Sequence, residues 1–110
     1  MSEARPELGP VATRVLFEDD HVRVWEQVIE PGESTGPHLH EVPYALVTVA
    51  GAEIEVRSVP GYPSPWPSAM RIPLASRSAD LVPAGAVEEA VNTGDTPYRA
   101  ILVEFKDADR

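Results

Sequence analysis

Cysteine is absent from the 110 residues of this chain, and its absence excludes disulfide bonds and thiolate metal sites. Basic residues are scarce, because 9 Lys and Arg stand against 18 Asp and Glu for a formal net charge of −9. An acidic surface repels nucleic-acid backbones and anionic lipids. We therefore expect neither a nucleic acid nor a membrane as a partner.

Long hydrophobic runs are also missing, and no apolar stretch approaches the roughly 20 residues that a membrane-spanning helix requires. The opening residues MSEARPE lack the basic start and apolar run of a secretory signal. We therefore expect a cytoplasmic protein. The length and the 43% hydrophobic content fit one domain over residues 1–110, with its core at about residues 12–106 and polar tails at both ends.

Proline and glycine, by contrast, are plentiful, and the 12 prolines and 7 glycines leave little room for a long helix. Short segments rich in Val, Ile, Leu and Thr lie between them, and turn residues follow most of these segments. Such punctuation is typical of an all-β sandwich or barrel. The predicted strands are His21–Glu30, Tyr44–Ala50, Ala52–Val59, Ala79–Val82, Val87–Asn92 and Tyr98–Phe105.

Two histidines, His38 and His40, are separated by one residue. On a strand this spacing places both imidazoles on one face, where they could converge on a divalent metal ion. The pattern alone is weak, since two surface histidines would give the same spacing.

The wider context resembles the cupin superfamily. The first cupin motif has a Gly, five residues, His-x-His, three or four residues, a Glu, six residues and a Gly. The second motif has Pro-x-Gly, two residues, a His, three residues and an Asn. The matching residues are Gly32, His38, His40 and Gly51 for the first motif and Pro83, Gly85 and Asn92 for the second. The resemblance implies a single jelly-roll β-barrel, also called a double-stranded β-helix.

Three positions depart from the family pattern. Tyr44 (or Ala45 in the longer spacing) stands where the first motif has Glu, Glu88 stands where the second has His, and Arg77 replaces the Gly that usually opens the second motif. In the family, the two His and the Glu of the first motif hold a divalent metal together with the His of the second. The set that remains here, His38, His40 and Glu88, is two imidazoles and one carboxylate. Such a set suits Fe(II) or Zn, and Mn or Ni remain open.

Strand parity leaves some assignments open. Glu88 has Glu89 beside it, and only one of the two can face inward on a strand. Tyr44 has the same parity as the histidines, so we expect it to point inward, either as core filling or as a catalytic proton donor.

Three functional hypotheses follow. The leading one is a metal-dependent cupin enzyme that acts on a small organic metabolite by oxygenase-type or metal-assisted lyase or isomerase chemistry, with Glu88 and Tyr44 as catalytic residues. The second is a metal-free isomerase or cyclase in which Glu88 and His38 or His40 form an acid–base pair. The third is a non-catalytic cupin that binds a small ligand.

Two further expectations concern assembly and access. The strand-like segment Val11–Glu18 should pair across a two-fold axis to form a homodimer, as small cupins commonly do. Five prolines lie within Pro60–Pro73, which we predict to be a long loop with Trp66 buried, narrowing the mouth of the pocket.

Overall fold

The computed structural model describes residues 7–62, 69–74 and 78–107, and within these ranges it contains nine strands and no helix. A helix that could cross a bilayer is therefore not found among the described residues. The strands are β1 (Arg14–Glu18), β2 (Val22–Ile29), β3 (His38–Leu39), β4 (Tyr44–Ala50), β5 (Glu53–Ser58), β6 (Ala69–Pro73), β7 (Ala79–Val82), β8 (Val87–Val91) and β9 (Tyr98–Phe105).

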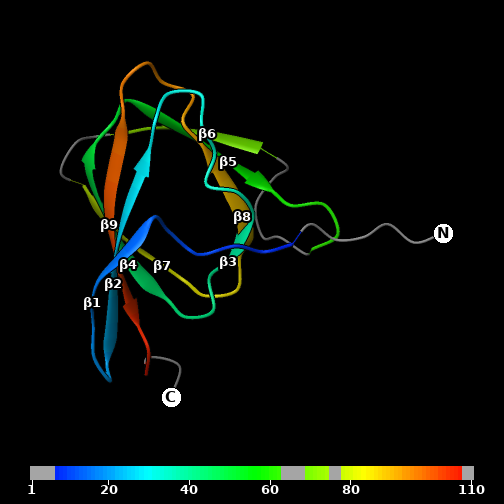
Figure 1. Cartoon of the computed structure of the whole chain (residues 1–110). Coiled ribbons are helices and arrows are strands. Elements are labelled where there is room, and N and C mark those ends of the chain that lie inside the picture. Colours follow the sequence, from blue (N-terminus) through cyan, green and yellow to red (C-terminus); the bar gives the residue numbers. More distant parts are fainter. Residues whose placement is uncertain (1–6, 63–68, 75–77, 108–110) are drawn as a thin grey trace.

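Two antiparallel sheets face each other, as Figure 1 shows. The five-stranded sheet has the order β1-β2-β9-β4-β7, and the four-stranded sheet has the order β3-β8-β5-β6. In the described part of the chain no strand pairing joins one sheet to the other, so the sheets are held together by packing between their inner faces and by hydrogen bonds at the strand ends. The all-β jelly-roll prediction is confirmed, although hydrogen bonds do not close the barrel.

Alternation along β9 shows how the sequence builds the inner face. Tyr98, Ala100, Leu102 and Glu104 are buried, and the residues between them are half-buried or exposed. This period of two is the mark of a strand with one face on the core. The buried hydrophobic cluster is formed by Ala12, Ile29, Tyr44, Ile54, Ala90, Tyr98, Ala100 and Leu102.

The prediction of one long loop over Pro60–Pro73 is wrong at its end, because β6 occupies Ala69–Pro73 and pairs with β5. Met70 and Ile72 are half-buried while the residues around them are exposed, so the short segment has the alternation of a strand. The proline is tolerated because β6 lies at the edge of its sheet and Pro73 is its last residue. Trp66, whose burial we predicted, lies outside the described residues.

A buried amide closes the end of the barrel near the β8–β9 turn. Asn92 is 1% exposed, its Nδ2 donates to the carbonyls of Ile29 and Thr96 at 2.9 and 2.8 Å, and its Oδ1 accepts from the Gly94 N–H at 2.9 Å. These bonds connect the end of β2 to the turn that follows β8. The position that the second cupin motif fills with Asn is therefore a structural clamp.

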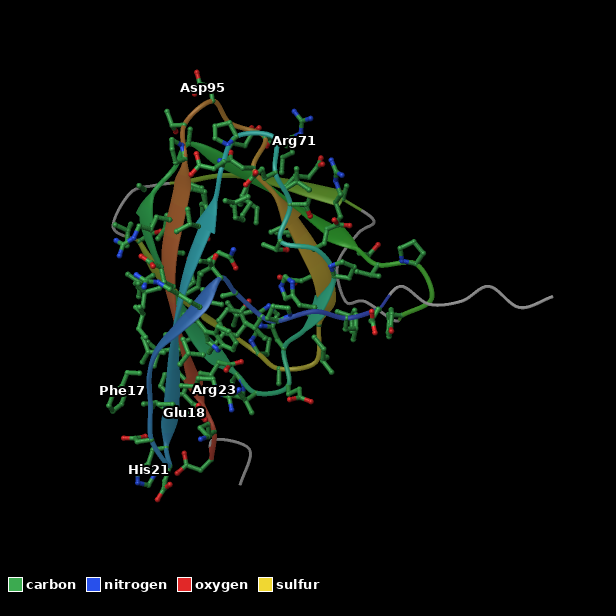
Figure 2. The ribbon with its side chains drawn as sticks, viewed as in Figure 1. Phe17, Glu18, His21, Arg23, Arg71 and Asp95 are labelled. Carbon is green, nitrogen blue, oxygen red and sulfur yellow. The ribbon has the colours of Figure 1, made fainter. Side chains whose placement is uncertain are left out.

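Replacing this amide tests the clamp. Asn92→Ala removes the side-chain donor from the buried Ile29 carbonyl and from the partly buried Thr96 carbonyl, and we expect the free energy of unfolding to fall by ~3 kcal/mol in urea denaturation. Asp95→Ala is the matched control, because Asp95 is exposed in the same turn, at the far end of the molecule from His21 (Figure 2). Equal stability of the two variants would contradict the clamp.

An ion-pair cluster joins β1, β2 and the segment after β9. Glu18 Oε2 accepts from Arg23 Nη2 at 2.9 Å and from Lys106 Nζ at 2.8 Å. These two hydrogen bonds lower the pKa of the Glu18 carboxyl from 4.5 to about 2, and the bond from Arg23 has the larger effect. A lowered pKa means that the cluster stabilises the fold above about pH 4.5, and that this contribution is lost as the pH falls toward 2.

Glu18→Gln should therefore lower Tm at pH 7 and have progressively less effect at pH 4, 3 and 2.5. The difference at pH 7 should be small, because the cluster is solvent-exposed, and it should shrink further in 1 M NaCl. Differential scanning calorimetry at each pH measures the difference in Tm between wild type and variant, and Glu33→Gln, at an exposed position, is the control. A Tm difference that is constant with pH would exclude the electrostatic origin.

Candidate metal centre

The pairing of β3 with β8 creates the site. His38 lies directly opposite Glu88 in this antiparallel ladder. β3 ends at Leu39, but the contact continues, since His40 N donates to the Ala86 carbonyl at 3.0 Å and Gly85 N donates to the His40 carbonyl at 2.8 Å. His40 is thus held beside the start of β8, on the same side as His38.

His38, His40 and Glu88 are all buried, and one potential ligand atom from each lies within 4.8 Å of the others. The structure therefore brings together the three residues that the sequence selected. Glu88 is 8% exposed, whereas the Glu89 carboxylate points the other way and accepts from Ser34 Oγ at 2.6 Å. Glu88, and not Glu89, belongs to the inner face.

A backbone carbonyl orients His38. Its Nδ1 donates to the Gly36 carbonyl at 2.9 Å, and Thr35 Oγ1 lies 3.4 Å from the same nitrogen. Burial, followed by the nearby charge of His40, lowers the pKa of His38 and favours the neutral ring. With the proton on Nδ1, the lone pair of Nε2 is free to bind an electrophile, which is the arrangement seen in metal-ligating histidines.

His40 is fixed by ring contacts. It stacks on Tyr44 with ring centroids 4.2 Å apart and an interplanar angle of 20°, and it meets the His38 ring edge to face at 4.8 Å. Its Nε2 lies 3.5 Å from Glu88 Oε2. Its Nδ1 is fully buried and has no hydrogen-bond partner in the described chain.

Tyr44 points inward, as strand parity predicted, and is 4% exposed. Burial, and after it the charge of Glu88, raises the pKa of Tyr44, so the phenol keeps its proton. Another buried carboxylate, Glu104, is the cross-strand neighbour of Tyr44 in the β4–β9 ladder. Its Oε1 accepts a hydrogen bond from Trp25 Nε1 at 2.7 Å. Tyr44 thus packs against His40 and at the same time offers a neutral O–H group.

The residues present fit a divalent transition metal. Two buried imidazoles and one carboxylate form a donor set used for Fe(II) and Zn. The unpartnered Nδ1 of His40 is a second sign, because a buried nitrogen with no partner is costly and a bound ion or water would satisfy it.

The three residues open onto a cavity of about 320 Å³ between the sheets. Several polar residues in its wall escaped the sequence analysis, among them Gln27, Thr48, Asp80 and Tyr98. Gln27 could have been found, because it has the parity of Ile29 on a strand that was predicted. The rest of the cavity wall is mainly aliphatic and includes Leu46, Ile54, Val56, Ile72 and Leu102.

Comparison with solved structures identifies the architecture. A cupin domain from Bordetella pertussis Tohama I matches with a TM-score of 0.73 at 23% identity, covering 96% of this chain and 99% of that one. The chain has the cupin fold. A double-stranded β-helix protein from Klebsiella pneumoniae has a TM-score of 0.60 at 20% identity, with 98% and 84% of the two chains covered.

A cupin 2 conserved barrel protein from Salinispora arenicola is a third match, with a TM-score of 0.62 at 19% identity over 86% of this chain and 75% of that one. No family model matches the sequence, and no curated protein is significantly similar to it. At these identities the cupin likeness establishes the fold and leaves function to the site.

Proposed function

We propose that this cupin is an enzyme that binds a divalent transition metal through His38, His40 and Glu88 and acts on a small organic metabolite. The observation that carries the proposal is the convergence of these three buried side chains, within 4.8 Å of one another, on the wall of a cavity. A buried polar cluster facing a largely apolar pocket is the common form of an active site.

A bound Fe(II), Zn, Mn or Ni ion would supply Lewis-acid chemistry, and Fe(II) would add oxygenase-type reactivity. The protein's own part is to hold and orient the reactants. His38 is locked by Gly36, and His40 is held between the rings of His38 and Tyr44. In this proposal the Tyr44 hydroxyl, which keeps its proton, donates a proton or hydrogen bond to a ligand beside His40. Aliphatic walls exclude bulk water and strengthen these interactions.

A metal-free reaction is the second candidate, and the 3.5 Å separation of His40 Nε2 and Glu88 Oε2 favours it. An imidazole and a carboxylate at this distance could move a proton on and off one substrate, as an isomerase or cyclase requires. A cupin that binds its ligand without chemistry would use the same cavity.

Substitution of Glu88 separates these candidates. Glu88→Ala should weaken metal affinity by at least about 100-fold, because two imidazoles alone leave the ion's charge uncompensated in the barrel. Glu88→Gln should fall between wild type and alanine, and Glu88→His should restore binding. Elemental analysis gives the metal content, and thermal shift with Fe²⁺, Mn²⁺ or Zn²⁺ gives affinity, since an ion at 100 times its Kd stabilises the fold by ~2.7 kcal/mol.

Glu89→Ala is the matched control, because it removes the neighbouring carboxylate on the other face and should leave metal binding unchanged. If none of the three ions stabilises wild type, and Glu88→Ala behaves like wild type in every ion, the metal assignment is wrong. Turnover that depends on Glu88 without any metal would support the acid–base enzyme, and ligand binding without turnover would support the binder.

We also propose that the chain forms a homodimer through β1 and the outer face of the five-stranded sheet. Val15, Leu16 and Phe17 on this edge strand are all exposed, and Figure 2 shows Phe17 pointing away from the space between the sheets. β4 carries apolar residues on both faces, a pattern of strands that are covered on both sides. A second copy would cover this surface.

Phe17→Glu should convert such a dimer into a monomer, because a charge would be buried at the interface. Light scattering coupled to size-exclusion chromatography at micromolar concentration measures the mass. Ala69→Glu is the control, since Ala69 is exposed on β6, the edge strand of the four-stranded sheet and so outside the proposed interface. A monomeric wild type would refute the dimer.

A further inference from the structure

Gln27 is a buried amide in the cavity wall that the proposed chemistry does not use. It lies on β2, two residues before Ile29, and both side chains line the cavity. Gln27 is only 7% exposed. A buried amide of this kind requires partners for both its nitrogen and its oxygen.

Thr13 fixes which end of the amide faces the cavity. Thr13 Oγ1 accepts from the Val28 N–H at 2.9 Å and directs its own hydrogen toward the Val28 carbonyl at 3.4 Å. With its hydrogen used, Thr13 Oγ1 can only accept a further hydrogen bond, and it accepts one from Gln27 Nε2 at 3.2 Å. The amide nitrogen is thereby committed to Thr13, and the oxygen is left on the other side. Nothing in the described ranges donates to that oxygen.

The neighbours of Gln27 on the same inner face do not supply a donor. Gln27 lies opposite Ala100 in the β2–β9 ladder, and Ala100 lies opposite Thr48 in the β9–β4 ladder. Ala100 offers only a methyl group. The Thr48 side chain is hydrogen-bonded to Tyr98. The Gln27 oxygen therefore has its lone pairs available to a molecule in the cavity.

The charges in the cavity wall restrict that molecule further. Glu88 and Asp80 both line the cavity, and no Lys or Arg is found among its described lining residues. In the protein without a bound metal ion, an anionic ligand would meet two carboxylates and the Gln27 oxygen. Most of the remaining wall is aliphatic and suits an apolar body.

We propose that the cavity selects a ligand with an apolar body and one O–H or N–H group that donates a hydrogen bond to Gln27 Oε1, and that without a bound metal ion it prefers an uncharged ligand to an anion. This inference rests on the proposed function in that it places the substrate in the same cavity. It makes Gln27 a specificity-determining residue and Thr13 a positioning residue that acts through it.

Matched fragment pairs test the proposal in protein treated with chelator, so that metal binding does not enter the result. The probes are phenol with anisole, benzyl alcohol with benzyl methyl ether, and benzamide with N,N-dimethylbenzamide, together with benzoate as the anion. Titrations followed by methyl NMR shifts of Ile29 and Ile54 report binding inside the cavity. Wild type should bind each donor about tenfold more tightly than its methylated partner, and benzoate more weakly than benzamide.

Gln27→Met keeps the length of the side chain and removes the acceptor, and it should reduce the donor preference to less than about threefold. Thr13→Val keeps Gln27 but frees its amide to rotate, so the preference should fall partway while the fold is retained. Two results would overturn the proposal: a donor preference that survives in Gln27→Met, or a wild type that favours the methylated partners.

The same titrations in Glu88→Ala distinguish this inference from the proposed function. If the donor preference persists in Glu88→Ala, and neither wild type nor the variant binds a metal ion, then Gln27 remains the specificity residue and the metal-dependent enzyme is excluded. If wild type binds a metal ion but shows no donor preference, the proposed metal site remains and the role of Gln27 is excluded.

Discussion

The antiparallel pairing of β3 with β8 holds the whole site in register, although β3 is only two residues long. It sets His38 opposite Glu88 and, through the backbone bonds of His40 with Ala86 and Gly85, brings the second imidazole alongside. A shift of one residue would turn Glu88 outward and bring Glu89 in, because side chains alternate across a strand. Thr35 supports the register from the flank, since its Oγ1 accepts from the Ala90 N–H at 3.0 Å.

The inner faces of the barrel carry an unusual share of polar groups for so small a core. Glu104, Gln27, Thr48 and Asn92 are all buried, and each has at least one specific partner. Networks of this kind rigidify a core when they are satisfied and destabilise it when they are not. His40 and Gln27, which also line the cavity, each keep one side-chain atom for which the described chain supplies no hydrogen-bond partner, and this contrast separates them from the structural polar residues.

Much of the fold could be predicted because period-two patterns and turn residues are local signals. Tyr44–Ala50 and Tyr98–Phe105 have the bounds that the sequence indicated, and the cupin spacings led to His38, His40 and Glu88. The sequence could not decide between Glu88 and Glu89, because that choice depends on how β8 pairs with β3 and β5. Strand β6 was missed because the density of prolines outweighed its five-residue alternation, although its partner, β5, is the strand that precedes it along the chain.

Gln27 was missed for a different reason. Its strand and parity were visible, but a glutamine among apolar residues gives no sign of what its amide contacts, and Thr13 is 14 residues away. Tyr44 was found only because a motif drew attention to its position. Local patterns thus predict which face a side chain occupies, whereas its hydrogen-bond partners follow from the three-dimensional pairing of strands.

In the part of the chain that the structure describes, no strand of one sheet pairs with a strand of the other, and this has a consequence for how such a protein could diversify. In a barrel closed by hydrogen bonds, strand number and stagger fix the interior width. Here the separation of the sheets depends on the volumes of the side chains between them, so a larger or smaller residue at Leu46, Ile54 or Ile72 would change the interior without breaking a ladder. Side-chain volume at those positions therefore sets the distance between the sheets. Related barrels could acquire new ligands by point substitution there while the β3–β8 register stays intact.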